Sequence, residues 1–245
     1  MIRWLRDELR GLLRALTGVE RGTAVVLVMA AVLSLAQDRW GHQRVFRNHL
    51  AELVGAEPSG LGQYLWHHGT QCLSGFVIPV VILLVVLRRP WRDVGLGLGN
   101  WKLGLAIAAL YVPLVTVGCW LLSAQPAFAD TYPNFAPAAD DWGVFLIYQL
   151  TCLVYWVGWE YLWRGFVLFG TAPTFGRAAI FVQMVPFAVL HLHKPPVEAF
   201  LSVLGGLALG AVVWQCRSFW IAVPIHAYQM AAMDFFCALR SRGDL

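Results

Sequence analysis

Long apolar runs constrain the fold of this chain more than any other feature. A helix that crosses the hydrocarbon core of a bilayer needs about 20 such residues. Apolar residues make up 59% of the 245 residues and charged residues only 13%, whereas soluble domains have about a quarter charged residues. We therefore expect an all-α, polytopic bundle in a membrane. About seven spans are predicted, near residues 22–37, 70–87, 103–124, 143–170, 178–193, 197–214 and 218–238.

Residues 1–18 precede these runs and have a different pattern. Four arginines recur at helical spacing on one side, and leucines occupy other positions. This pattern predicts an amphipathic helix on an anionic membrane surface. The segment lacks the cleavage site and compact apolar core of a secretory signal. We expect an interfacial helix at 1–21 and a single transmembrane domain at 22–245. The arginines are Arg3, Arg6, Arg10 and Arg14.

Basic residues indicate which ends of the spans face the cytoplasm. Lys and Arg concentrate in cytoplasmic loops, and the net charge of +4 comes mainly from short arginine clusters beside apolar runs. This pattern is typical of cytoplasmic loops rather than of nucleic-acid binding. We expect the protein to lie in a bacterial inner membrane. Segment 125–142 has three aspartates and no Lys or Arg, so it is predicted to lie outside. Arg240 and Arg242 fall on that side too, against the rule. The predicted inner loops are 1–21, 88–102, 171–177 and 215–217.

Three patterns indicate structure rather than chemistry. The five cysteines are scattered and form no C-x-x-C, which supports neither a zinc cluster nor a disulfide framework. Adjacent His67 and His68 are predicted in a solvated loop rather than in a metal site. The glycines of 95–99 predict a turn, and Gly206 and Gly210 predict close helix packing.

Charged and polar residues interrupt three of the later spans. Glu160 and Arg164 are four residues apart and can pair on one helix face. A charge at the bilayer centre costs roughly 2.5–3.5 kcal/mol, so such residues usually have a function; a structural ion pair is the alternative. His191 and His226 lie in two further spans, and Asp234 follows two turns later. At about 1.5 Å per residue, Glu160 and both histidines lie roughly 13–21 Å from the inner loops.

A carboxylate and two imidazoles at one depth suit the activation of water beside a carbonyl group. The glutamate can act as general base, one histidine can share the proton, and the second can stabilise an oxyanion. The same side chains are also a plausible ligand set for a divalent metal such as zinc. Because no H-E-x-x-H motif is present, the metal-free mechanism is favoured.

These residues resemble the motifs of the CPBP family (CAAX protease and bacteriocin-processing), intramembrane endopeptidases that include the type II CAAX prenyl proteases. The family pattern is E-E-x-x-x-R, then F-x-x-x-H, then H-x-x-x-N or H-x-x-x-D. Segments 159–164, 187–191 and 226–230 correspond to these motifs in order. The resemblance covers about residues 90–238 and implies the family's helical membrane fold.

The chain departs from this pattern at two positions. Trp159 stands where the family has its first glutamate, the catalytic base, and Met230 stands where it has its final Asn or Asp. Glu160 would then replace the missing base, in a helix rotated by about 100° per residue. Further polar groups are expected from His193, Glu198 and Asp234.

The resemblance implies an intramembrane endopeptidase that cleaves near the membrane-proximal end of a protein or peptide. Glu160 would activate water, His191 would assist it and His226 would stabilise the oxyanion. Arg164 would orient the glutamate. In a bacterium, a sorting-signal or bacteriocin-type substrate fits better than a CAAX tail.

Two other functions stay open. A catalytically silent relative would bind membrane peptides without cleaving them, in keeping with Trp159 and Met230. A proton-coupled transporter would use Glu160 and the histidines as a relay, although the sequence shows no internal repeat of the kind transporters have. Convergence of Glu160, His191 and His226 would favour hydrolysis.

Overall fold

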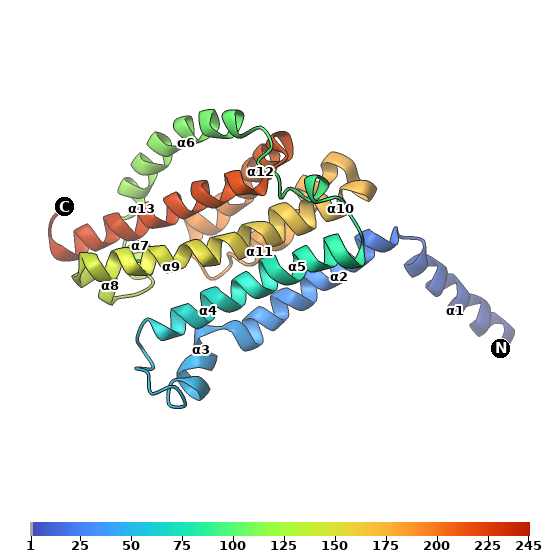
Figure 1. The fold of residues 1–245 in the computed structure, drawn as a ribbon, viewed down its shortest axis with the longest axis horizontal. Coiled ribbons are helices and arrows are strands. Elements are labelled where there is room, and N and C mark those ends of the chain that lie inside the picture. Colours follow the sequence, from blue (N-terminus) through green and yellow to red (C-terminus); the bar gives the residue numbers. More distant parts are fainter. Residues whose placement is uncertain (1) are drawn as a thin grey trace.

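Helices make up most of the computed structural model, which describes residues 2–245 (Figure 1). No strand occurs in that range. Shorter helices join end to end through π-helical turns, so that α4 and α5 form one rod and α9 and α10 another. The elements are α1 (Ile2–Thr17), α2 (Arg21–Ala36), α3 (Gln43–Val45), α4 (Gly62–Cys72), α5 (Ile78–Val81), α6 (Trp101–Leu122), α7 (Pro126–Ala129), α8 (Pro137–Asp140), α9 (Trp142–Glu160), α10 (Leu168–Phe175), α11 (Ala179–Val189), α12 (Pro196–Cys216) and α13 (Ala222–Arg242), with π-helical segments at Gln37–Gly41, Phe46–Leu50, Leu73–Val77, Ile82–Val86 and Tyr161–Val167, and 3-10 turns at Trp91–Val94, Gly176–Ala178 and Phe219–Ile221.

Five helical stretches among the described residues are long and apolar enough to cross a membrane, so the predicted count of seven spans is not confirmed. One stretch contains two predicted spans, because the chain reverses at Gly176, where φ is 54°. Helix α13 is not among the five, since His226, Gln229 and Asp234 lower its hydropathy. The stretches are Arg21–Leu50, Gly62–Val86, Trp101–Leu122, Trp142–Val189 and Pro196–Cys216.

Helix α1 corresponds to the helix predicted at 1–18 and extends away from the bundle (Figure 1). Its Trp4, Leu5 and Leu9 side chains are exposed. The side chains of Arg3, Leu13 and Leu16 lie outside the described residues. The position of this helix on a membrane surface stays a prediction.

The prediction that His67 and His68 lie in a solvated loop is wrong. Both lie in α4. His68 is buried, and its Nδ1 forms a hydrogen bond of 3.1 Å with Thr151 Oγ1 on α9. His67 Nδ1 donates to the Gly41 carbonyl at 3.0 Å. The helix begins earlier than expected because its polar side chains find partners on neighbouring segments.

Turns that are distant in sequence meet where α1 leaves the bundle (Figure 1). Residues from all four loops that were predicted on the inner side of the membrane make contacts at this end. Glu20 Oε2 lies 3.9 Å from Arg89 Nη2, and the Asn100 N–H donates to the Cys216 carbonyl at 2.8 Å. Thr23 Oγ1 lies 2.8 Å from Thr174 Oγ1.

Arg240 and Arg242 lie at the opposite end, beside the segment that follows α6. Arg240 donates from Nε to Ser123 Oγ at 2.8 Å and from Nη2 to the Trp120 carbonyl at 3.0 Å. Arg242 Nε donates to the Ala139 carbonyl at 2.5 Å. Carbonyls near helix C-termini lack partners within the helix and attract cations. These two arginines therefore satisfy the ends of α6 and α8, which accounts for basic residues on the acidic side.

The contact between α11 and α12 confirms the close packing predicted at Gly206 and Gly210. A Cβ atom on Gly206 would lie 3.1 Å from Met184 Cγ and from Phe187 Cδ1. A Cβ atom on Gly210 would lie 2.6 Å from Gln183 Nε2. Gln183 Nε2 also donates to the Gly206 carbonyl at 2.8 Å. The two glycines thus hold α11, and with it Phe187, against α12.

Gly210→Ala is expected to destabilise the protein by ~1–3 kcal/mol, the usual cost of overpacking, because Gln183 must move. Gly205→Ala is the matched control, since a Cβ atom there has no neighbour within 4 Å. Thermal unfolding in detergent, followed by circular dichroism, compares the two variants. Equal melting temperatures would contradict this account of the helix contact.

Candidate active site

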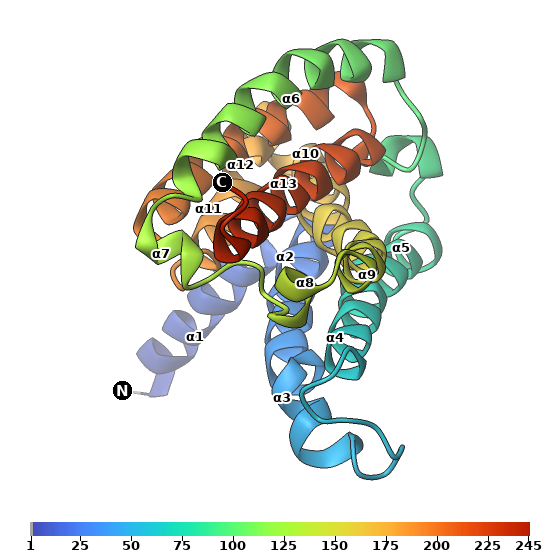
Figure 2. The same ribbon diagram turned by 90° about the vertical axis from the view of Figure 1, so that its left-hand side faces the viewer.

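Glu160 is the last residue of α9, and the π-helical segment Tyr161–Val167 begins directly after it. Figure 2 shows α9 between α4 and α13. Helices α4 and α9 approach closely at Gly158, where a Cβ atom would lie 2.2 Å from the Gln71 carbonyl oxygen. The Glu160 side chain is completely buried. A buried carboxylate requires polar partners within the protein.

Two side chains bind one oxygen of the Glu160 carboxylate. Oε1 accepts hydrogen bonds from Nη1 of Arg164 at 3.2 Å and from Nδ1 of His226 at 2.6 Å. The predicted pair is therefore present, and α13 adds the histidine. Oε2 is buried and bonds to no described residue. One carboxylate oxygen is held in place while the other keeps its lone pairs for an incoming donor.

Arg164 is completely buried and contacts both Glu160 and Phe187. Its guanidinium carbon lies 3.9 Å from the centre of the Phe187 ring, a cation–π geometry. Nε and Nη2 form no hydrogen bond within residues 2–245. Arg164 thus fixes the orientation of the carboxylate and links it to α11.

His191 lies in the turn after α11, and its Nδ1 donates to the Phe187 carbonyl at 2.7 Å. A carbonyl only accepts, so Nδ1 carries the proton and Nε2 of the neutral ring has a free lone pair. In the described chain no hydrogen bond joins His191 to Glu160 or His226. The Phe187 ring contacts both histidines, with ring centres 4.5 Å from His191 and 6.2 Å from His226. The structure therefore joins Glu160, Arg164 and His226 directly and places His191 beside them across Phe187.

Two tryptophans of α9 pack against the two histidines. The Trp156 ring lies 4.2 Å from the His226 ring at an interplanar angle of 30°. The Trp159 ring lies 6.0 Å from His191 and 5.9 Å from Phe187. Trp159 therefore faces the His191 side of the cluster, whereas Glu160 faces His226. Adjacent helical residues are about 100° apart, so they cannot share one direction.

Glu198 belongs to a second polar cluster at the start of α12. The Tyr132 hydroxyl lies 2.8 Å from each carboxylate oxygen of Glu198 and donates to this carboxylate. Lys194 Nζ donates to the same hydroxyl oxygen at 2.7 Å. Burial and the adjacent Glu198 carboxylate raise the pKa of Tyr132 above its ordinary value. The hydroxyl thus stays protonated and ties the segment before α8 to the His191 turn.

The remaining sequence candidates do not bond to the Glu160 cluster in the part of the chain described. Asp234 accepts a hydrogen bond of 2.7 Å from Gln149 Nε2. His193 is exposed, and Met230 is buried in an apolar cluster with Phe128. The roles expected of these residues stay predictions.

The Glu160 cluster does not fit a metal ion. Within residues 2–245 no three His, Cys, Asp or Glu side chains are grouped as metal ligands. Glu160 Oε1 is occupied by two donors, and His191 Nδ1 faces a carbonyl. The buried Arg164 cation would also repel a divalent ion.

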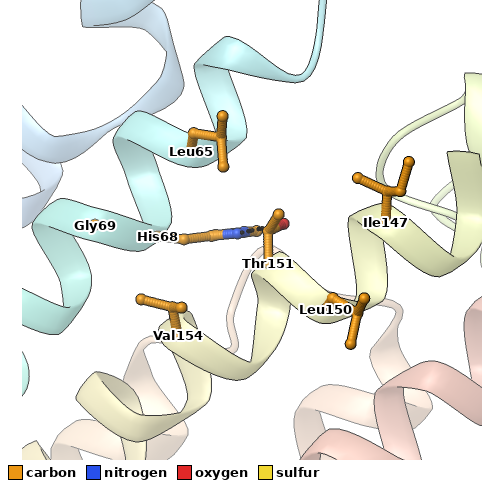
Figure 3. Close-up of a pocket in the computed structure, with 7 residues that line it drawn as sticks. All are labelled: Leu65, His68, Gly69, Ile147, Leu150, Thr151 and Val154. Carbon is orange, nitrogen blue, oxygen red and sulfur yellow. Dashed lines mark hydrogen bonds between the residues drawn. The ribbon is translucent and has the colours of Figure 1, made fainter.

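An apolar groove of about 350 Å³ lies between α4 and α9, on another face of α9 from Glu160 (Figure 3). In Figure 3 the His68 ring extends across the groove toward Thr151. Because no member of the Glu160 cluster lines it, the groove is separate from the candidate site. It is lined by Leu65, His68, Gly69, Ile147, Leu150, Thr151 and Val154.

Comparison with known families matches residues 141–231 to the family described as type II CAAX prenyl endopeptidase Rce1-like. This range contains the buried Glu160 cluster. This segment of the chain is therefore similar to the CAAX protease family. No curated protein and no solved structure matches the chain. With its long apolar helices, this relationship indicates an integral membrane protein.

Sequence reasoning identified the polar members of the cluster but missed its supports. Gly158, Trp156 and Tyr132 were not singled out, although each contacts a candidate residue or sets its position. A lone glycine in an apolar span is a usable signal for close helix approach. No sequence pattern distinguishes Tyr132 in its irregular segment.

Arg164→Met is expected to destabilise the protein by about 3–5 kcal/mol, the cost of leaving a buried charge unpaired. Combining it with Glu160→Gln should recover part of this loss, because a neutral amide needs no counter-ion. The measurement is a double-mutant cycle, in which the unfolding free energies of the wild type, both single variants and the double variant are compared in detergent. Strictly additive losses would show that the two side chains are not coupled.

Proposed function

We propose that this protein is an intramembrane endopeptidase that hydrolyses a peptide bond near the membrane-proximal end of a protein or peptide. The family relationship supports a protease of the CAAX type. One observation carries the glutamate-dependent mechanism. The fully buried Glu160 has one oxygen held by Arg164 and His226, while the other bonds to no described residue.

Glu160 would act as the general base through Oε2. It takes a proton from water as the water oxygen bonds to the peptide carbonyl carbon, and the carbonyl oxygen becomes an oxyanion. When the C–N bond breaks, the proton passes to the amine nitrogen, so the products are a carboxylic acid and an amine. A positioned general base typically contributes about 10²–10⁴-fold.

His226 would stabilise the oxyanion in its imidazolium form. Its Nδ1–H remains bonded to Glu160 Oε1, so the second proton sits on Nε2 and can be donated to substrate. The Trp156 ring, 4.2 Å from the His226 ring and tilted by 30° from it, restricts the orientation of the imidazole. A donor at this position is worth about 10²–10³-fold in rate.

His191 would assist the attacking water as a hydrogen-bond acceptor. Its Nε2 lone pair is available because the Phe187 carbonyl holds the proton on Nδ1. Phe187 also lies against Arg164, so one residue sets the positions of the cation and the imidazole. The proposed substrate is a sorting-signal or bacteriocin-type peptide, because it would present its cleavage site close to the membrane.

Trp159 favours a second candidate function, that of a relative which binds membrane peptides without cleaving them. Its indole stands at the first position of the E-E motif and packs against Phe187 and His191. The cluster therefore has one carboxylate where the motif has two. The indole ring of Trp159 occupies the volume beside His191.

Glu160→Gln is expected to lower hydrolysis at least about 100-fold, because an amide cannot accept the proton from water. Purified protein in liposomes is assayed with membrane-anchored fluorogenic peptides, one set farnesylated at a CAAX end and one set unprenylated. Glu52→Gln makes the same change on an exposed residue and should keep the activity. Full activity of the Glu160 variant, with its melting temperature unchanged, would exclude Glu160 as the base.

Trp159→Glu separates the two candidate functions, because it restores the motif's first carboxylate. A silent protein is expected to gain hydrolysis that the wild type lacks in the same liposome assay. Trp159→Phe keeps an aromatic ring and serves as the control. If the wild type cleaves the peptides and the Trp159→Glu variant cleaves them no faster, the proposal that this protein is catalytically silent is wrong.

A further inference from the structure

One end of the bundle gathers exposed basic residues on turns that are distant in sequence. This end, called the basic end below, contains the start of α2 and the turns before α6, after α10 and after α12 (Figure 1). The contacts between these turns, described above, make it one continuous surface. Its exposed basic residues are Arg21, Arg88, Arg92, Lys102, Arg177 and Arg217.

Two of these arginines have a backbone conformation that favours glycine. Arg88 has φ 54° and Arg217 has φ 57°. Left-handed backbone is unfavourable for a residue with a Cβ atom and nearly free for glycine. The chain does use glycine nearby, at Gly95 (φ 78°) and Gly99 (φ 53°). Arg88 therefore carries a cationic side chain at a position whose backbone conformation favours glycine.

The cation of Arg88 has no partner within residues 2–245. It forms no hydrogen bond or ion pair with another described residue, and its side chain is exposed. Arg217 lies over the rings of Phe169 at 4.9 Å and Trp214 at 5.9 Å. The strain at Arg88 thus points to a partner outside the chain.

Exposed tryptophans lie among the basic residues of this end. Trp91, Trp101 and Trp220 are 50%, 53% and 36% exposed. The charged group of Arg92 lies 5.2 Å from the Trp91 ring centre, and that of Lys102 lies 5.9 Å from the Trp101 ring centre. Tryptophan is enriched where membrane proteins meet lipid headgroups. In a membrane, such rings would place the neighbouring cations at headgroup level.

Several arginines at the opposite end are used differently. Arg44 Nη2 lies 3.0 Å from Asp38 Oδ2, and Arg240 and Arg242 bond to backbone carbonyls. Protein groups bind each of these three cations, whereas Arg39 at the same end is exposed. At the basic end, the side chains of Arg21, Arg88 and Arg177 are exposed and form no hydrogen bond or ion pair within residues 2–245.

We propose that the basic end binds the headgroups of anionic phospholipids. Arg88 and Arg177, both exposed, would bind phosphate oxygens, and the tryptophan rings would lie between headgroups and acyl chains. Helix α1 leaves the bundle at this end with Arg6 and Arg10 exposed, and Arg10 Nη1 lies 3.9 Å from Asp7 Oδ1. This inference goes beyond the proposed peptidase function and does not depend on it.

Native mass spectrometry of the full chain in detergent, with equimolar phosphatidylglycerol and phosphatidylcholine, tests the proposal. The wild type is expected to retain phosphatidylglycerol preferentially. Arg88→Gly should reduce this preference about fivefold, and Arg177→Ala should have a similar effect. Because glycine relieves the backbone strain, Arg88→Gly should not lower the melting temperature.

Arg39→Ala is the matched control, since Arg39 is exposed in the π-helical segment that follows α2, far from the basic end, and should not affect the preference. If Arg88→Gly fails to fold, a salt titration of the wild type replaces it, and the preference should weaken as salt screens the charges. Equal retention of the two lipids by the wild type would overturn the proposal. So would an equal loss in Arg39→Ala, or a preference that salt does not change.

Discussion

The buried ion pair of Glu160 and Arg164 is the constraint on which the centre of this protein depends. An isolated charge inside a membrane bundle is strongly unfavourable, so each partner requires the other in a fixed geometry. His226 comes from α13 to share Glu160 Oε1, and Phe187 comes from α11 to lie against the guanidinium. The pair therefore determines the positions of three helices around one carboxylate.

Small residues allow these helices to approach closely enough for such contacts. Gly158 brings α9 against α4, and Gly206 and Gly210 bring α12 against α11. Side chains at these positions would separate the helices and move Phe187 away from Arg164. The contacts that stabilise the helix bundle are consequently the same contacts that position the candidate catalytic residues.

The helical class and the Glu160–Arg164 pair followed from the sequence because each has a local signature. The proximity of His226 was expected from its similar depth in a separate span. Apolar runs of bilayer length indicate spans, and four-residue spacing indicates pairing. The predicted number of spans is not confirmed, because one apolar stretch contains two predicted spans and polar side chains lower the hydropathy of α13. His68 was misplaced for the same reason, since its partner Thr151 lies far along the chain. No sequence pattern indicates which distant residue will form a hydrogen bond with a buried polar side chain such as His68.

Attachment of the basic end to headgroups would also set the depth of the candidate site. Helix α10 ends at Phe175 near that surface, and the rod from there back to Glu160 spans about 20 Å at 1.5 Å per residue. A peptide bond must therefore reach Glu160 well below the headgroup level. An extended segment of about six or seven residues covers this distance at roughly 3.3 Å per residue. A membrane-proximal tail can supply such a segment, whereas a folded domain at the surface cannot, and the depth of Glu160 thus limits the substrates that the proposed peptidase can accept.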